Sequence, residues 1–479
     1  MKKGFYIRAA LPFACVALLG GCTAPGGTDT QYIRLSDAAC SFQGTGNRPV
    51  TIEVHTNPAT WKAEASASWV KVSDVTATSF TIEVVDNDTN EIREAEITVT
   101  AGQAEEVIKV MQMVGDHSFP RYRSRPEVFQ NLAPMSPNGK YVGSFYYGQD
   151  ESGTTVFYPV IIDVEKDEWH ELGPFPKTLF ELGETSCMTD NGEVIIAALN
   201  DANILFDLDG NYTKIEPPAG YTNYPEISQV SADGTMVGWA SKGGVSSPFK
   251  WVDGVAEELP KPELNYRDEQ ARGISADGRI IYGTTWDNRD YGLVYWDENG
   301  EVHYVGEDVR YCRPVDRPDG YGGTYKYNLC DGMWTSATKT NVSPNGKYIA
   351  GTFRREALEE GAESSVVETN YPAFFNTETG KTVIFEELVG GGGVAATSDG
   401  LGFTVDDTFG SSSGKVVDIE NGIVLGDALE WIQENYGIIV PSGYITYMPD
   451  SKDRFQGGML WTGGAAVQGV NWYVAPPAK

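Results

Sequence analysis

Residues 230–260 read VSADGTMVGWASKGGVSSPFKWVDGVAEELP, and residues 274–306 read ISADGRIIYGTTWDNRDYGLVYWDENGEVHYVG. Both segments pass through the same series: a Ser-Ala-Asp-Gly turn, a strand-like run, an apolar run with tryptophan, and a second stretch of turn residues. A unit of about 40–50 residues with this composition cannot bury its apolar face alone. The repeat therefore predicts β-units that pack against one another.

The second segment predicts the strands of one such unit. Asp277 and Gly278 suit the positive φ of a tight hairpin turn. The expected strands are residues 272–275, 279–285, 293–296 and 301–305. Tight turns join the first strand to the second and the third to the fourth, and a looser link joins the middle two. This pattern is typical of one antiparallel blade of a β-propeller.

The same turn recurs along the rest of the chain. It occupies residues 136–139, 189–192, 231–234, 275–278, 343–346 and 397–400, with a degraded copy at 448–451. Seven copies predict seven blades, or six if one of the weak last two copies is not a blade. The chain ends before a last outer strand, so residues 119–125 are expected to supply it and close the ring, because closure removes exposed sheet edges.

The repeat resembles the Ser-x-Asp-Gly repeats of TolB-like propellers and, more closely, the HAF-type repeats of bacterial extracellular proteins. Residues 427–437 predict a helix with an aspartate cap and a terminal glycine, in a position that the HAF-type resemblance also implies. These families have many functions, so the resemblance implies a fold and little chemistry.

The N-terminus has the features of an export signal. Lys2, Lys3 and Arg8 precede a short apolar run that ends in Leu-Gly-Gly-Cys at Cys22. This ending resembles a bacterial lipobox, which implies a signal peptide over residues 1–21 and a lipid anchor on Cys22. Small polar residues make 22–31 a flexible tether. We expect an outer-membrane, cell-surface lipoprotein, with the periplasmic face as the alternative.

Residues 32–115 predict a separate strand-rich domain, and residues 116–479 the propeller. The features in the first region are Trp61, Trp69, the turn 87–90, the alternating strand 93–100 and Gln112. It resembles a BACON domain of Bacteroidetes, which implies an immunoglobulin-like β-sandwich and either carbohydrate binding or a spacer role. The spacing of the two tryptophans favours core positions over sugar stacking. The expected fold class is all-β: a sandwich followed by a propeller.

Charge excludes one class of partner. The chain has 36 basic and 67 acidic side chains, and loss of residues 1–21 leaves 33 and 67, a net charge of −34. Such a surface repels phosphate backbones, so no nucleic-acid partner is expected. Four scattered histidines indicate no metal cluster or triad, and we expect no cofactor and no metal. GxSxG at 410–414 lacks the strand before and helix after that a nucleophile elbow needs.

The expected binding site lies on one face of the propeller. The connections between second and third strands, and between blades, carry most of the length variation and share that face. The longest are residues 307–334 and 353–370. We expect a disulfide between Cys312 and Cys330, because an exported protein permits one. The candidate ligand-binding residues are Trp286, Asp287, Arg289, Tyr291, Tyr321, Tyr325, Tyr327 and Trp334.

Three functions remain open from the sequence. The favoured one is non-catalytic binding of a glycan or glycoconjugate through the variable face, with the BACON-like domain as spacer or auxiliary binder. An outer-membrane protein would be a further partner. The second is a propeller glycoside hydrolase or polysaccharide lyase, since paired carboxylates are defined by separation in space. The third is a protein-interaction scaffold of the envelope.

Overall fold

The computed structural model describes two bodies of β-structure. The described residues are 31–42, 44, 47–87, 89, 92–113, 121–124, 135–150, 152–166, 168–176, 184–197, 203–221, 226–262, 269–285, 292–318, 321, 323–334, 342–359, 365–406, 413–440, 443–458 and 471–475. Cys22 and the signal region lie outside them. No helix among these residues is long and apolar enough to span a membrane.

The N-terminal body consists of two four-stranded sheets. Their orders are β1-β3-β6-β5 and β2-β8-β7-β4. The strands are β1 (Tyr32–Leu35), β2 (Ala39–Phe42), β3 (Val50–Asn57), β4 (Lys62–Ala65), β5 (Val70–Ser73), β6 (Ser79–Val84), β7 (Arg93–Ala101) and β8 (Ala104–Gln112). Alternate residues of both sheets form one buried core. One pair, β2 with β8, is parallel, although the alternation indicated only antiparallel strands.

Both tryptophans of this body pack against its core, as their spacing predicts. Trp61 and Trp69 are partly buried beside the core cluster. The Trp61 indole Nε1 donates a hydrogen bond of 3.0 Å to the Ala77 carbonyl. The guanidinium of Arg93 lies 4.5 Å from the centre of the Trp69 ring. The described contacts therefore give both rings a structural role.

Seven further sheets follow in the described chain. Their strands are β10 (Tyr141–Gln149), β11 (Thr155–Asp163), β12 (Glu168–Glu171) and β13 (Phe175–Pro176); β14 (Glu184–Met188), β15 (Val194–Ala197), β16 (Asn203–Phe206) and β17 (Tyr212–Ile215); β18 (Glu226–Val230), β19 (Met236–Lys242), β20 (Val245–Val252) and β21 (Val255–Glu258); β22 (Glu269–Ile274), β23 (Ile281–Thr285), β24 (Leu293–Trp296) and β25 (Val302–Tyr304); β26 (Tyr311–Pro318), β27 (Thr324–Trp334), β28 (Tyr348–Leu358), β29 (Val366–Asn376) and β30 (Lys381–Ile384); β31 (Gly391–Ala396), β32 (Leu401–Asp406), β33 (Lys415–Asp418) and β34 (Ile423–Asp427); and β35 (Tyr444–Tyr447), β36 (Phe455–Gly458), β37 (Trp472–Ala475) and β9 (Arg121–Ser124).

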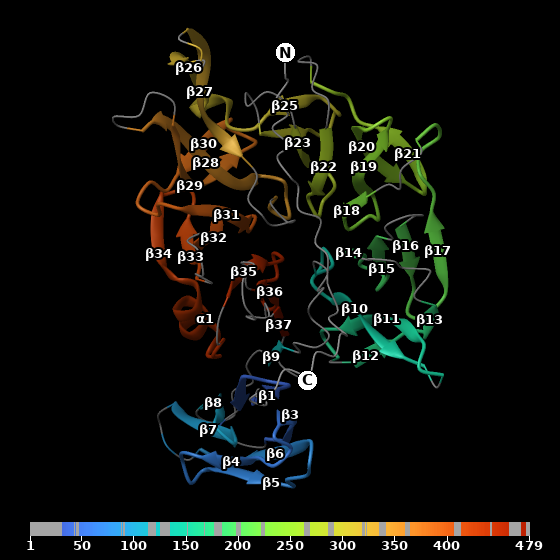
Figure 1. Ribbon diagram of the computed structural model, residues 1–479, viewed down its shortest axis with the longest axis vertical. Helices are drawn as coiled ribbons and strands as arrows, with labels where there is room; N and C mark the ends of the chain where they lie inside the picture. Colours follow the sequence, from blue (N-terminus) through green and yellow to red (C-terminus); the bar gives the residue numbers. More distant parts are fainter. Residues whose placement is uncertain are drawn as a thin grey trace.

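These sheets stand around a common axis, with strands such as β14, β18, β22 and β31 nearest to it (Figure 1). Within a sheet each strand pairs antiparallel with the next one in the chain, as the repeat predicts. Meandering sheets arranged radially define a β-propeller.

The two ends of the propeller meet in its last sheet. β9 pairs antiparallel with β37, from Trp472 opposite Ser124 to Ala475 opposite Arg121. This confirms that residues 119–125 contain the outer strand of the last sheet. Nearby, the Met135 amide donates to Gln456 Oε1 at 2.7 Å, and the Tyr447 hydroxyl donates to the Pro137 carbonyl at 2.7 Å. Closure therefore rests on strand pairing and on polar contacts at the inner end.

The Ser-x-Asp-Gly signature is explained by hydrogen bonds within the turn. Ser275 Oγ donates to Asp277 Oδ1 at 2.6 Å and accepts from the Ile280 amide at 3.0 Å. Gly278 takes a positive φ of 76° and closes the turn onto the Ser275 carbonyl. Equivalent hydroxyl-to-side-chain bonds join Ser136 to Asn138, Ser231 to Asp233, Ser343 to Asn345 and Thr397 to Asp399. The motif is therefore a structural one.

The degraded seventh copy is shifted by one residue from the predicted position. The Lys452 amide donates to the Pro449 carbonyl at 3.0 Å, so the turn spans residues 449–452. Lys452 has a φ of 53° where the other turns have glycine. Ser451 Oγ donates to Asp453 Oδ1 at 2.6 Å.

The helix α1 (Ala428–Tyr436) begins and ends as predicted. Asp427 caps it by accepting from the Leu429 amide, and Gly437 ends it in a left-handed conformation. Gln433 Nε2 of this helix donates to Glu94 Oε1 of β7 at 3.2 Å. Ala39 of β2 shares a buried cluster with Ile432 and residues of the last two sheets. The N-terminal body therefore packs against the propeller beside α1 and β9 (Figure 1).

Candidate functional site

The two longest connections are β-hairpins, whereas the sequence predicted loops. Residues 307–334 contain a short 3₁₀ helix, η3 (Glu307–Val309), followed by β26 and β27, which pair from Tyr311 opposite Asp331 to Pro318 opposite Thr324. Residues 353–370 continue the β28–β29 pairing to Leu358 opposite Val366. Tyrosine, threonine and alternation suit these residues to a ladder, but their glycines and prolines suggested a loop. Both hairpins extend from the face with variable connections.

One face of the β26–β27 hairpin carries tyrosines and arginines. Residues opposite one another in an antiparallel pair share a face, so Arg317 lies beside Tyr325. The Arg317 guanidinium also lies 4.5 Å from the Tyr327 ring centre. Tyr325 is 46% exposed, Tyr311 60%, and Tyr321, in the connection, 97%. The hairpin therefore presents aromatic rings to solvent.

A disulfide joins the two strands of this hairpin. Cys312 and Cys330 stand opposite each other with a Cα separation of 4.1 Å and are bonded. They point to the face opposite Tyr325, because odd and even positions alternate. In the chain-entropy picture, closing a loop of this size stabilises by about 3 kcal/mol.

Thiol labelling tests this pairing. Under denaturing, non-reducing conditions, we expect the buried free thiols of Cys40 and Cys187 to be alkylated while Cys312 and Cys330 are not. Mass spectrometry of the peptides gives the answer, and adding a reductant before alkylation is the positive control. Alkylation of both Cys312 and Cys330 without reductant would contradict the disulfide.

A polar network holds the root of the hairpin against β28. Glu356, only 2% exposed, accepts a hydrogen bond at 3.1 Å from the Cys330 amide through Oε2. Asp331 Oδ1 accepts from the Glu356 amide at 3.0 Å. Arg313 pairs with Asp331 at 3.3 Å and also donates to the Glu356 carbonyl. Buried carboxylates with these partners are satisfied, so the network orients the hairpin.

Trp334 is half-buried. The Arg354 guanidinium lies 4.3 Å from its ring centre, and a Cβ at Gly292 would stand 3.0 Å from two of its ring atoms. Arg354 is itself paired with Glu368 at 3.4 Å. The ring therefore packs between the fourth and fifth sheets, and the exposed tyrosines are the more accessible aromatic groups.

The other four predicted residues fall on a segment that the structure does not describe. Trp286, Asp287, Arg289 and Tyr291 all lie within 286–291, outside the described residues. Their place relative to Tyr321, Tyr325, Tyr327 and Trp334 remains a prediction. Of the predicted set, the structure brings Tyr325 and Tyr327 onto one hairpin face, with Tyr321 in its connection.

A pocket on the same face was missed by the sequence. It lies between the fifth and sixth sheets and has a volume of about 190 Å³. Pro372 and Val405 contribute apolar surface, and Glu387, Asp406 and Lys415 contribute charges. Asp406 directly precedes the connection from the second to the third strand of its sheet, and Glu387 lies in the link between sheets. The residues are scattered over 44 positions and form no motif, so no sequence signal could have found them.

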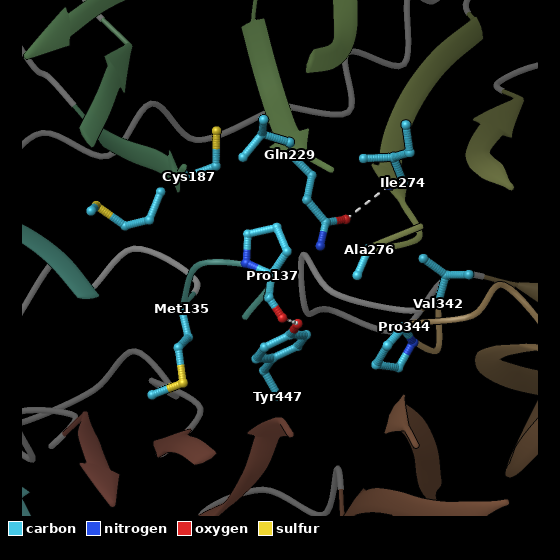
Figure 2. Close-up of a pocket in the computed structure, with 11 residues that line it drawn as sticks. Met135, Pro137, Cys187, Gln229, Ile274, Ala276, Val342, Pro344 and Tyr447 are labelled. Atoms are coloured by element: carbon cyan, nitrogen blue, oxygen red, sulfur yellow. Dashed lines mark hydrogen bonds between the residues drawn. The ribbon is translucent and has the colours of Figure 1, made fainter. Parts of the chain in front are cut away.

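The central axis is nearly closed at the opposite face. Turn residues Pro137, Ala276 and Pro344 of three sheets converge there with Gln229 and Tyr447 (Figure 2). The remaining cavity is about 10 Å³, room for at most about one water molecule. Gln229 Oε1 accepts from the Ile274 amide at 2.9 Å, so its side chain ties two sheets together. This end of the axis holds the blades and has no space for a ligand.

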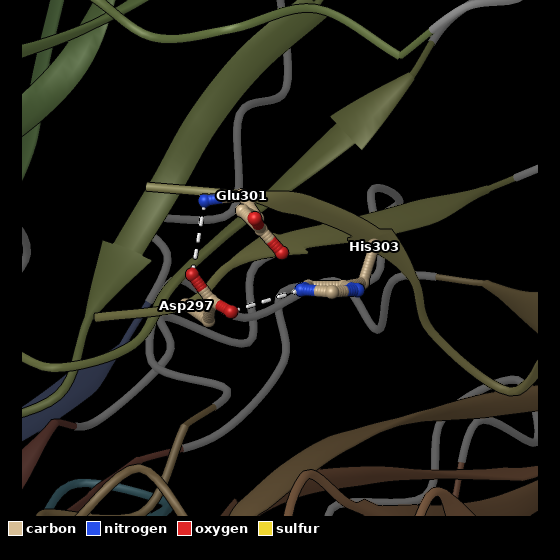
Figure 3. Close-up of side chains that lie close together, drawn as sticks. All are labelled: Asp297, Glu301 and His303. Carbon is tan, nitrogen blue, oxygen red and sulfur yellow. Dashed lines mark hydrogen bonds and ion pairs between the residues drawn. The ribbon is translucent and has the colours of Figure 1, made fainter. Parts of the chain in front are cut away.

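Asp297, Glu301 and His303 form a group with the composition of a metal site (Figure 3). His303 Nε2 lies 3.1 Å from Asp297 Oδ2, and Asp297 Oδ1 accepts from the Glu301 amide at 2.9 Å. Burial raises the pKa of Asp297, but the bonds from the Glu301 amide, His303 and the Asn299 amide outweigh it, and the pKa is lowered.

Equivalent turns show what Asp297 does. Asp163, Asp207, Asn376 and Asp418 occupy the matching position in other sheets and accept backbone amides in the same way. A side chain that caps this turn in sheets with different neighbours is structural. The group around Asp297 therefore resembles the other turn caps and is not a built cation site.

Comparison with known proteins supports the domain assignment. Residues 59–113 match the BACON family model, described as "Putative binding domain, N-terminal". No curated protein matches the chain. The N-terminal body thus contains a BACON domain, within a chain whose other described sheets form a propeller.

Three solved structures illustrate the similarities. The Bacteroides ovatus GH5 xyloglucanase, in complex with a XXXG heptasaccharide, is 19% identical over 26% of this chain and only 30% of its own, with a TM-score of 0.15. The Dos1 propeller is 12% identical over 71% and 91%, with a TM-score of 0.36. The propeller domain of the Pyrococcus furiosus Trilobed protease is 11% identical over 81% and 95%, with a TM-score of 0.34. These scores are low, so the fold assignment rests on the sheet order and arrangement above.

Proposed function

We propose that this protein binds glycans or glycoconjugates through the variable face of its propeller, without catalysis. The observation that carries the proposal is the tyrosine-bearing face of the β26–β27 hairpin, where Tyr311 and Tyr325 are exposed and the root is fixed by a polar network. Flat aromatic rings match the apolar C–H face of a sugar ring, and a rigid hairpin loses little conformational entropy on binding.

A glycan array followed by a reducing-end assay tests this function. We expect purified protein to retain a subset of glycans on the array and to release no new reducing ends from them. Release of reducing ends, or of unsaturated products, would assign a hydrolase or lyase instead. Absence of binding and cleavage would refute the glycan proposal and favour an envelope scaffold that contacts an outer-membrane protein.

We further propose the finer division of the chain. Each of the seven propeller sheets is one blade, with repeats of the Ser-x-Asp-Gly type found in HAF-like and TolB-like proteins. Residues 22–31 form a tether, 32–115 an immunoglobulin-like sandwich and 116–479 the propeller. The contacts of α1 with β2 and β7 support a spacer that holds the propeller in a fixed orientation.

The anchor is proposed to be a lipid on Cys22 in the outer membrane, with the variable face exposed at the cell surface. The support is the lipobox-like ending of the apolar run before this residue. We expect Cys22→Ala to move the protein from the membrane fraction to the soluble fraction after a salt wash. Persistence of the variant in washed membranes would contradict the lipid anchor.

A further inference from the structure

The pocket between the fifth and sixth sheets has a preorganised wall. Residues 385–391 link the two sheets and are held by their own backbone: the Leu388 amide donates to Phe385 at 3.1 Å and the Gly390 amide to Asn370 at 2.8 Å. A Cβ at Gly391 would stand 2.7 Å from the Val405 carbonyl, so only glycine permits this approach. The wall therefore needs no reordering when a ligand enters.

The other wall is equally fixed. Thr404 Oγ1 accepts from the Lys415 amide at 3.0 Å. The Asp406 amide donates to the Ser413 carbonyl at 3.0 Å. A Cβ at Gly414 would stand 2.3 Å from the Thr404 carbonyl, which again requires glycine. Two rigid walls with a floor of buried Pro372 and Val405 make a small pocket with an apolar base.

The charges of the pocket select the ligand. Its one ammonium, on Lys415, already pairs at 3.5 Å with Asp427, the cap of α1. The carboxylates of Glu387 and Asp406 leave these four groups with a formal charge of −2. Ionised carboxylates only accept hydrogen bonds, so a ligand must donate, and an anionic ligand meets like charge.

Two neighbours strengthen this selection. Glu386, adjacent to Glu387, is already paired with Arg355 at 2.8 Å, and this bond raises the pKa of Arg355. Glu387 itself makes no ion pair within the described part of the chain. Asn370 shares a strand face with Pro372, and its buried Oδ1 accepts no hydrogen bond from a described group. The pocket thus offers several acceptors around an apolar floor.

We propose that this pocket is a subsite for one uncharged, hydroxyl-rich sugar unit, and that it rejects uronate and sulfated units. The proposal rests on the proposed function and specifies its substrate class. A sugar ring places its C–H face on Pro372 and Val405 and donates its hydroxyls to Glu387 and Asp406. The volume of about 190 Å³ lies below the 300–1,000 Å³ typical of drug-sized ligands, which fits one sugar unit.

Rim variants with matched controls test the subsite. Val389 stands on the rim and is 62% exposed, and Val255 on β21 is 70% exposed and follows a turn on the opposite face. We expect Val389→Trp, which covers the opening, to weaken binding of the best neutral oligosaccharide from the array at least tenfold by calorimetry. Val255→Trp is expected to bind as wild type. Both side chains are exposed, so both variants should fold.

A charge variant tests the selectivity. Glu387→Lys is expected to weaken binding of the neutral oligosaccharide about tenfold and to reduce the discrimination against its uronate counterpart, with Glu378→Lys on the opposite face as the control. Wild-type binding that survives both Val389→Trp and Glu387→Lys, or that prefers acidic glycans, would overturn the subsite alone. No binding of any glycan by wild type would refute the proposed function and the subsite together.

Discussion

Replacing Trp296 with alanine is expected to lower the free energy of unfolding of the propeller by about 3–5 kcal/mol. The ring is completely buried and packs in a cluster with Val237 of the third sheet and Ile281 of its own. Its Nε1 donates to the Pro260 carbonyl at 2.7 Å. Removing the ring leaves a cavity between two sheets and an acceptor without its donor, and both effects destabilise.

Denaturant titration followed by circular dichroism measures this change. Trp251→Ala should lose a comparable amount, because its ring is 1% exposed, although its indole nitrogen has no described partner. Trp296→Phe is the graded control and should lose less, since most of the volume remains. A Trp296→Ala protein within 1 kcal/mol of wild type would show that neighbouring side chains collapse into the space and that the blade interface is not well packed.

The turns were predictable because their chemistry is local. In the turn that begins at Ser275, hydroxyl, carboxylate and glycine act within five residues of one another, so the motif and its function coincide in the sequence. The helix capped by Asp427 was predictable for the same reason. Ring closure also followed, since an incomplete last unit and an unassigned early strand leave one pairing that removes both edges.

The site was less predictable because it depends on contacts between distant residues. The hairpin β26–β27 is held by Glu356 and Asp331, which are 25 positions apart and match no motif. Trp334 had the composition of a stacking residue, yet its exposure depends on Arg354 and Gly292. The pocket wall at Glu387 belongs to a different sheet from Lys415. Local patterns report turns and caps, whereas walls arise from packing.

The hairpin tyrosines provide the second large effect. We expect the double variant Tyr321→Ala/Tyr325→Ala to weaken glycan binding at least tenfold while the free energy of unfolding stays within about 0.5 kcal/mol of wild type. Truncating an aromatic anchor costs about 2 kcal/mol at an interface, roughly thirtyfold in affinity. Both rings are exposed, so folding loses little when they are removed.

Controls separate binding from folding in this experiment. Tyr212→Ala removes a tyrosine of similar exposure, 48%, from β17 beside a turn on the opposite face, and should bind as wild type. Trp286→Ala and Trp334→Ala are also expected to weaken binding at least tenfold in folded protein. For Trp334, part of the loss should come from the Arg354 guanidinium, which loses the ring that it covers. If the double tyrosine variant and both tryptophan variants bind as wild type while folded, the glycan does not contact this face, and Trp61 and Trp69 of the BACON domain become the next residues to replace.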